Sequence, residues 1–156
     1  MTKTNVMRIL DKLEVKYSSL EYEYDENDLS GVSVASKNGL DPERVFKTLV
    51  CVDESGANKV FCIPVEYELD LKKCARVSDV KRIEMIHVKD LLKVTGYIRG
   101  GCSPVGMKKQ FPTFIDETAQ LFDTIYVSGG LRGVQIELSP LKLAEIINAR
   151  FCDLLK

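Results

Sequence analysis

The first residue that could take part in binding or catalysis is a lysine inside an apolar run. Lys47 lies in VFKTLVCV at residues 45–52, where the β-branched residues predict a strand. Because strand side chains alternate between two faces, Lys47 shares a face with Val45 and Leu49. If that face points inward, the ammonium loses water and needs an anion or carbonyl partner. If the strand lies at a sheet edge, the lysine reaches solvent along its apolar stem, and both interpretations stay open.

A glycine-rich stretch, GYIRGGCSPVGMKKQFPTFID at residues 96–116, separates two apolar runs. Gly100 and Gly101 permit main-chain conformations and close approaches that other residues resist. Successive N–H groups in such a turn form a nest suited to an oxyanion, a carbonyl or a phosphate. Taken alone, the same residues favour a plain connecting loop, and both interpretations stay open. A second turn, GGLRG at 129–133, is interpreted as a hairpin loop with Arg132 at its tip, where it could meet a phosphate.

Protein nucleophiles and metal ligands are scarce. A nucleophile at Cys102 requires a lowered pKa and a nearby base, and His87 is the one histidine of the chain. A Ser-His-Asp arrangement would need the same histidine. Five cysteines without a CxxC pair predict neither a disulfide framework nor a zinc site. The residues therefore predict a pocket of one lysine, loop amides and hydroxyls, with no metal or cofactor, that positions a substrate whose own groups react.

Length, charge and hydropathy limit the class of protein. With 156 residues, 45% of them hydrophobic, and a net charge of −1, the chain predicts one globular domain over residues 1–156. No apolar run reaches 18 residues and the N-terminus lacks a signal-peptide pattern, so we expect a cytoplasmic protein. The near-neutral charge argues against a general nucleic-acid coat but permits a local basic patch. Acidic residues gather at 21–28, and basic pairs lie at 72–73, 81–82 and 108–109.

The elements that must position these residues follow from hydrophobic periodicity and capping residues. Helices are predicted over residues 4–15, 30–38, 69–75, 88–94 and 139–153. Strands are predicted over residues 17–24, 45–52, 59–65, 114–116, 124–128 and 134–138. Hairpins with helices between and after them predict an α/β (α+β) domain with a largely antiparallel or mixed sheet. A dinucleotide-binding fold is not expected, because GxGxxG after a first strand is absent.

Several segments together resemble the YbaK/ProX family of trans-editing aminoacyl-tRNA deacylases. They are YEYD at 22–25, VFKTLV at 45–50, LDLKK at 69–73, TGYIRGGCSPVGMKKQFPTFID at 95–116 and TIYVSGGLRG at 124–133. The likeness extends from about residue 6 to residue 151 and is greatest to the bacterial Cys-tRNA(Pro) deacylases. It implies a mixed, barrel-like sheet with surrounding helices, as in the inserted editing domain of bacterial prolyl-tRNA synthetases.

The resemblance also implies an activity. Such domains remove cysteine mischarged onto proline tRNA, because a small pocket cannot fully reject a similar-sized amino acid at the charging step. In relatives of this kind, the cysteinyl thiol attacks its own ester carbonyl and leaves a cyclic thioester and free tRNA. Catalysis then comes from positioning and fixed dipoles, without a protein nucleophile or cofactor. The implied partners are the 3′ end of Cys-tRNA(Pro) and prolyl-tRNA synthetase in a transient complex, with no membrane and no metal.

The family's site residues carry over position by position. Lys47 and Gly101 are the expected catalytic residues, Lys47 through the substrate carbonyl or the terminal ribose and phosphate. The expected substrate-binding residues are Tyr22, Thr48, Gly100, Cys102, Ser103, Ser128, Gly129, Gly130 and Gln135. Lys108, Lys109 and Arg132 are expected to contact the tRNA.

Three positions depart from the family pattern. Many relatives have an apolar residue at the position of Cys102, and relatives often have histidine at Tyr24 and aspartate at Gln135. That aspartate is a candidate partner for the substrate amine, whereas Gln135 offers a hydrogen bond without a charge. Gln135 keeps open a hydrolytic deacylase for another small amino acid, such as Ala-tRNA(Pro), in which water attacks. A non-catalytic module that binds a tRNA end or a nucleotide also stays open, as does a cysteine hydrolase that acts through Cys102.

Overall fold

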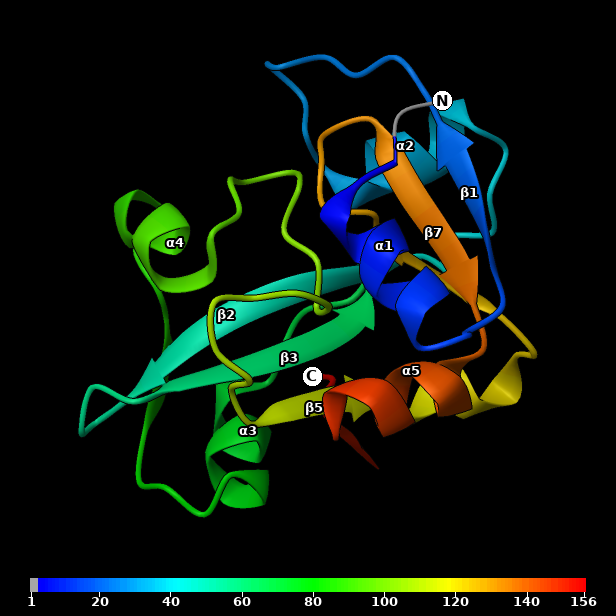
Figure 1. Cartoon of the computed structure of the whole chain (residues 1–156). Helices are drawn as coiled ribbons and strands as arrows, with labels where there is room; N and C mark the ends of the chain where they lie inside the picture. The colour runs from blue at the N-terminus through cyan, green and yellow to red at the C-terminus, as the bar shows by residue number, and fades with distance from the viewer. Residues whose placement is uncertain (1–2) are drawn as a thin grey trace.

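The computed structural model describes residues 3–156 as a mixed α+β arrangement (Figure 1). Its helices are α1 (Asn5–Lys12), α2 (Gly31–Lys37), α3 (Leu71–Val77), α4 (Val88–Thr95), the 3-10 helix η1 (Glu117–Leu121) and α5 (Pro140–Ile147). Its strands are β1 (Tyr17–Glu21), β2 (Phe46–Asp53), β3 (Asn58–Pro64), β4 (Ile83–Met85), β5 (Thr113–Asp116), β6 (Ile125–Ser128), β7 (Val134–Leu138) and β8 (Arg150–Cys152). The mixed α and β architecture predicted from the sequence is confirmed.

The strands form two sheets that meet at the start of β2. β1, β7 and β6 make an antiparallel sheet, and β4, β2, β3, β5 and β8 make a mixed sheet in which β5 pairs in parallel with β3 and with β8. A parallel bridge between Val45 and Tyr126 connects the two, so the barrel-like fold consists of abutting sheets that do not close. In Figure 1 the long β2–β3 hairpin crosses the centre of the molecule, with α4 at the upper left and β1 and β7 at the upper right.

The helices begin and end where side chains or glycine satisfy the terminal main-chain groups. Thr4 Oγ1 accepts a hydrogen bond from Met7 N at the start of α1, and Ser139 caps α5 in the same way through Lys142 N. Gly96 ends α4 with a φ of 87°, a left-handed conformation that glycine adopts without strain. The glycine-rich loop therefore begins at a fixed point after α4.

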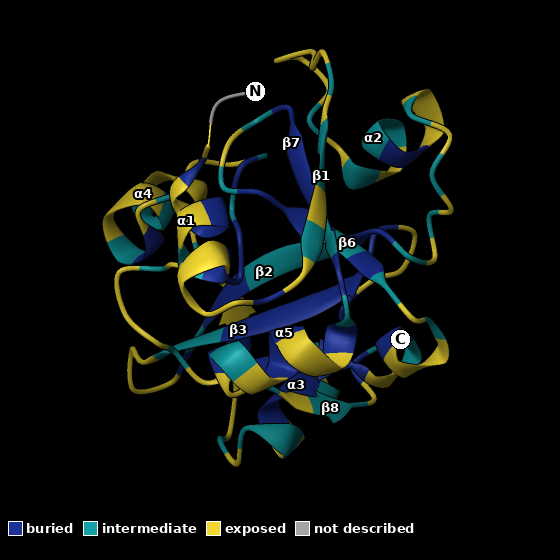
Figure 2. Ribbon diagram, turned by 45° about the vertical axis from the view of Figure 1, so that its right-hand side comes forward, coloured by how far each residue is buried: buried dark blue, intermediate teal, exposed yellow. Residues whose placement is uncertain are grey.

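Two main groups of buried side chains hold the sheets in place. The larger packs α1 and α5 against the sheets and includes the fully buried Leu10, Ile136 and Leu143. The second lies around Phe61, whose ring stacks on Phe114 with the centroids 5.4 Å apart. Figure 2 shows β3 buried along most of its length, whereas α4 is largely exposed. The site described below lies where this exposed helix faces the buried hairpin.

Two boundaries and two short strands differ from the prediction. The helix expected to continue to residue 153 ends at Ile147, because Asn148 adopts a left-handed conformation with a φ of 52°. The chain then turns back, and residues 150–152 form β8 beside β5. The strand expected over residues 17–24 ends at Glu21, opposite the first residue of β7. The three-residue strand β4 was not predicted, since its short pattern gains strand character only by pairing with β2.

Candidate active site

A cavity of about 460 Å³ opens beside β2, between α2, α4 and the end of the three-stranded sheet. On this edge, β2 pairs with β4 only from Cys51 onward, and the bridge to Tyr126 lies at Val45. Residues 46–49 therefore have β3 on one side and no strand on the other. The volume lies in the range of roughly 300–1,000 Å³ typical of small-molecule sites. The cavity thus lies beside a stretch of β2 that has no neighbouring strand on that side, and we call this stretch the gap.

This gap leaves main-chain groups of Thr48 without a strand partner. Val45 O accepts a hydrogen bond from Val65 N on the β3 side, whereas Val50 O accepts one from Ile86 N on the opposite side. Because main-chain groups alternate in direction along a strand, the N–H and C=O of Thr48 point the same way as those of Val50. The open edge therefore presents one main-chain donor and one main-chain acceptor to the cavity.

Lys47 lines the cavity with a half-buried side chain. Its Nζ donates a hydrogen bond of 3.4 Å to Val65 O, which leaves two ammonium protons for a ligand. Burial lowers the pKa of Lys47 from its ordinary value, and the charge of Glu68 acts weakly in the opposite direction. The two interpretations left open by the sequence each hold in part, because the strand edge is locally open and the ammonium is still half-buried.

The glycine loop is held by a close approach of two main-chain segments. A Cβ atom on Gly101 would lie 3.1 Å from Arg132 N and 3.2 Å from Leu131 C. The Arg132 side chain joins the same two segments, because its Nε donates to Arg99 O at 2.8 Å. Gly100 has a φ of 87°, which favours glycine, and it lines the cavity. At Gly100 and Gly101 the loop therefore offers main chain without side chains to this wall, between the lining residues Arg99 and Cys102.

Another wall comes from the end of the three-stranded sheet. Gln135 on β7 lies directly opposite Ser128 on β6, and its Nε2 donates to the Tyr22 hydroxyl at 3.4 Å. Gln135 is 7% exposed, and its Oε1 is buried without a hydrogen-bond partner. Among the buried side-chain polar atoms of residues 3–156, only Ser78 Oγ is also unpartnered, and Ser78 does not line the cavity. Leaving a buried acceptor unpaired costs about 1–3 kcal/mol, so a hydrogen-bond donor that reached this atom would stabilise it.

Cys102 lines the cavity but has the wrong environment for a nucleophile. Burial raises the pKa of its thiol to about 12, and a hydrogen bond involving Thr95 offsets only part of that rise. The thiol therefore stays protonated near neutral pH. His87 is exposed at the N-cap of α4 and does not line the cavity. A cysteine hydrolase needs a thiolate beside a base, and the described residues of the cavity do not provide that pair.

Seven of the residues predicted for catalysis or substrate binding line this one cavity: Tyr22, Lys47, Thr48, Gly100, Cys102, Ser128 and Gln135. The remaining four are not among its lining residues. Gly101, Ser103 and Gly129 are buried, and Gly130 N donates to Ser128 Oγ. Lys108 and Lys109 line a separate groove between α1 and α5, and Arg132 lies between the two loops. The roles of all these residues stay predictions.

The sequence reasoning missed the apolar lining of the cavity. It comes from the region of α2 and from β4 and α4, and its members include Leu29, Val34, Met85, Ile86, Val88 and Leu91. The sequence pattern of these residues is that of any side chain facing a core. No local signal separates them from core residues, since only the tertiary arrangement brings them around Lys47.

Two general findings concern residues 3–156. They contain no group of three or more His, Cys, Asp and Glu side chains that could hold a metal ion. None of the helices in this range is both long and apolar enough to cross a membrane.

Comparison with known proteins identifies the family to which this chain belongs. The aminoacyl-tRNA editing domain family matches residues 29–146, and the chain belongs to that family. A relative in Enterococcus faecalis, named "Putative Cys-tRNA(Pro)/Cys-tRNA(Cys) deacylase EbsC", is 49% identical over 97% of this chain and 93% of its own length. The uncharacterized protein YwhH of Bacillus subtilis is 24% identical over 79% of this chain and 78% of its own.

Solved structures share the fold. The crystal structure of "a putative trans-editing enzyme for prolyl tRNA synthetase" superposes with a TM-score of 0.81 at 22% identity, over 100% of this chain and 99% of the other. A protein described as hypothetical superposes with a TM-score of 0.89 at 20% identity, over 98% of this chain and 100% of the other. These likenesses support the editing-domain fold that the sequence motifs implied.

Proposed function

We propose that this protein deacylates Cys-tRNA(Pro) in trans and that the thiol of the substrate is the nucleophile. Membership of the editing family supports an activity on aminoacyl-tRNA. The name of the E. faecalis relative supports cysteine as the amino acid and proline or cysteine tRNA as the carrier. The cavity beside β2 is the proposed site for the aminoacylated 3′ end.

The proposal rests on the polar groups of the cavity that still have hydrogen-bonding capacity. Gln135 Oε1 accepts no hydrogen bond, and Lys47 Nζ donates only one, which is long. An aminoacyl ester presents an ammonium group, which is a donor, and a carbonyl oxygen, which is an acceptor. We assign the ammonium to Gln135 and the carbonyl or terminal ribose to Lys47. The open main-chain groups of Thr48 supply further contacts to the ester or the ribose.

The proposed reaction forms no bond to the protein. The substrate sulfur attacks the carbonyl carbon of its own ester, so a C–S bond forms and the C–O bond to the ribose breaks. The thiol proton ends on the departing ribose oxygen, which leaves a cyclic thioester of cysteine and uncharged tRNA. Lys47 and the amides near Gly101 stabilise the negative charge that develops on the carbonyl oxygen. The cavity contributes by holding the thiol close to the carbonyl.

The protonated state of Cys102 supports this route over a protein thiolate. The chain has a net charge of −1, which supports modest tRNA affinity because phosphate binding depends on basic residues. A transient complex with prolyl-tRNA synthetase in the cytoplasm is therefore the proposed source of the tRNA. No cofactor enters the proposed reaction.

The test is deacylation by the purified protein of Cys-tRNA(Pro), Ser-tRNA(Pro) and Ala-tRNA(Pro). Serine is the matched control, since it differs from cysteine by an oxygen in place of the sulfur. Rapid loss of cysteine with slow loss of serine and alanine is the expected result. Similar loss of alanine or serine would mean that water attacks, and the hydrolytic mechanism would replace this one. Binding of all three without any loss would instead support the non-catalytic module.

A further inference from the structure

Positive charge is concentrated in residues 81–111, which include α4 and the loop beside the cavity. Residues 81–111 carry seven lysines and arginines and two carboxylates, a net charge of +5 in a chain whose net charge is −1. The seven cations are Lys81, Arg82, Lys89, Lys93, Arg99, Lys108 and Lys109, and all are exposed. Within residues 3–156, only Arg82 among them forms an ion pair, with Glu84. The other six cations have no carboxylate partner in this range and can meet an external anion.

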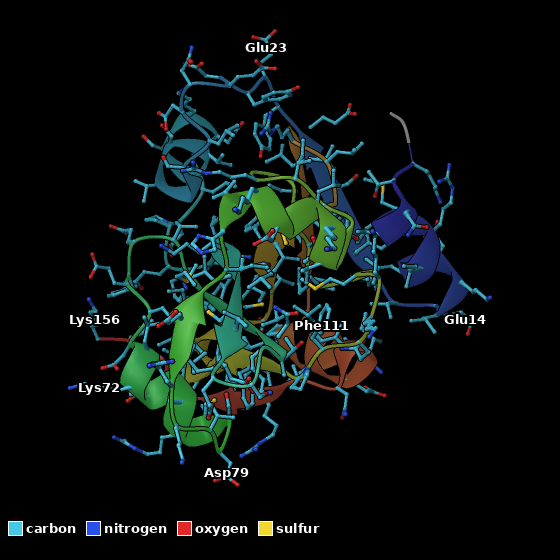
Figure 3. All side chains as sticks on the ribbon, turned by 90° about the vertical axis from the view of Figure 1, so that its left-hand side faces the viewer. Glu14, Glu23, Lys72, Asp79, Phe111 and Lys156 are labelled. Carbon is cyan, nitrogen blue, oxygen red and sulfur yellow. The ribbon has the colours of Figure 1, made fainter. Side chains whose placement is uncertain are left out.

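Helix α4 places part of this charge beside the cavity. Val88 and Leu91 line the cavity from α4, and Lys89 and Lys93 lie four residues apart on another face of the helix. Residues at this spacing are neighbours on a helix surface, about 6 Å apart along the axis. Figure 3 looks onto this side of the molecule, with α4 facing the viewer. The helix thus presents an apolar face to the cavity and a basic face to solvent.

The loop after α4 extends the basic face. Lys108 N donates to Thr95 O, and Lys108 Nζ donates to Lys93 O, so this lysine is fixed at the C-terminal end of α4. Arg99 lines the mouth of the cavity itself. We call Lys89, Lys93, Arg99 and Lys108 the α4 surface. Val88 and Leu92 are 62% and 55% exposed on the same helix, so apolar area lies beside the charges.

The opposite rim has the opposite sign. The segment 21–28 contains Glu21, Glu23, Asp25, Glu26 and Asp28, all exposed. Tyr22 and Leu29 from this region line the cavity, and Glu23 lies above α4 in Figure 3. A polyanion that reaches the cavity is therefore repelled along one rim and attracted along the other. This asymmetry favours an approach in which the nucleic acid lies along the basic rim and away from the acidic rim.

We propose that the α4 surface binds the phosphate backbone of the tRNA acceptor stem whose aminoacylated end occupies the cavity. The assignment rests on the proposed function, because that function requires an unpaired 3′ end in the cavity and a paired stem outside it. Lysines without carboxylate partners are the side chains that phosphate contacts use. Contacts to phosphates do not depend on the base sequence. This surface therefore orients the stem, and the cavity selects the amino acid.

The experiment compares two double variants. Lys89→Ala with Lys93→Ala removes two cations four residues apart on α4. Lys72→Ala with Arg76→Ala removes two exposed cations at the same spacing on α3, which contributes no lining to the cavity. For each protein we would measure the dissociation constant for uncharged tRNA(Pro) against salt concentration. Deacylation of Cys-tRNA(Pro) and of 3′-O-cysteinyladenosine would be measured alongside.

The α4 variant is expected to bind tRNA about 10- to 30-fold more weakly at 0.15 M salt, and its log–log salt slope should be flatter by about 1.4–1.8. Its ratio of tRNA to cysteinyladenosine activity should fall by a similar factor. The α3 variant should match the wild type in both. Equal loss in the two double variants would overturn the proposal, because it would show a response to net charge alone. An unchanged slope in a folded α4 variant would overturn it as well.

This design separates the two proposals. If the wild type deacylates neither substrate, the proposed function fails, and the salt dependence of binding still decides the role of the α4 surface. If deacylation proceeds normally and the α4 variant has the wild-type slope, the function stands and the surface assignment fails.

Discussion

Replacing Gln135 by methionine should make the protein more stable and less active. Methionine has a similar volume and a flexible, apolar side chain that fills irregular spaces. The substitution removes the buried Oε1, whose unpaired state costs about 1–3 kcal/mol, and gives up the 3.4 Å bond to Tyr22, worth at most about 0.5–1.5 kcal/mol. We therefore expect a net gain of about 1 kcal/mol in the free energy of unfolding. For a chain of this size that corresponds to a rise of about 2–4 °C in Tm.

The same substitution should damage catalysis. If Gln135 Oε1 holds the substrate ammonium, its loss removes a hydrogen bond to a charged group, worth about 1.5–3 kcal/mol. The expected fall in kcat/KM for Cys-tRNA(Pro) is about 10- to 150-fold, since each 1.36 kcal/mol corresponds to roughly a factor of ten. A position that costs stability in the empty cavity would then contribute to substrate binding.

Thermal unfolding and single-turnover deacylation measure the two effects on one preparation. Gln120→Met is the matched control, because Gln120 is exposed on η1 and lies outside the cavity. It should change neither Tm nor the rate. A Gln135→Met protein that unfolds at a lower temperature and deacylates at the wild-type rate would refute the reasoning, since Oε1 would then be satisfied without substrate.

Three further outcomes are expected. Cys102→Ala should keep most of the deacylation rate while Lys47→Ala loses most of it, as measured on Cys-tRNA(Pro); an inactive but folded Cys102→Ala protein would contradict the substrate-thiol route. Gly101→Ala should cost more free energy in kcat/KM than in the stability measured by Tm, because a Cβ there meets the adjoining main chain at 3.1 Å and shifts the loop amides. An unchanged rate would exclude a role for those amides. Burial raises the pKa values of Cys62 and Cys74 to about 12, so above the unfolded-state value near 9 the folded state holds more protons than the unfolded state. Stability should then fall from about pH 9 toward pH 12, by up to about 1.4 kcal/mol per pH unit for each of these thiols. Denaturant titrations at fixed pH would detect this, and replacing either thiol by alanine should make the fall less steep.

Much of the architecture could be predicted because its signals are local. The β2–β3 hairpin, α1 and α4 follow from hydrophobic period, turn residues and caps, and each lies within a few residues of its predicted range. The end of the last helix could not be predicted in this way. Residues 150–152 continue the helical pattern of apolar residues, and they become a strand only because β5 offers them an open edge. Pairing with a distant segment thus decides the structure of residues whose local preference is ambiguous.

The same distinction between local signals and tertiary contacts applies to the candidate site. The sequence by itself determined the kinds of groups present: one lysine in a strand, paired glycines beside Cys102, and a glutamine, Gln135, in another strand. Seven of the predicted residues meet in one cavity. The unpartnered state of Gln135 Oε1, the half-burial of Lys47 and the open edge at Thr48 exist only in the folded chain.

The sequence determined which side chains this protein can use, because residue type fixes charge, hydrogen-bonding capacity and local propensity. The tertiary structure decided where pairing stops. β4 joins β2 only from Cys51, and β6 is bridged only to Val45, the residue before β2, so a gap remains between them. That gap depends on contacts between residues 30 or more positions apart, and no local pattern encodes it. Hydrogen bonding and solvation inside the gap give the lysine and the glutamine the properties from which we infer their roles.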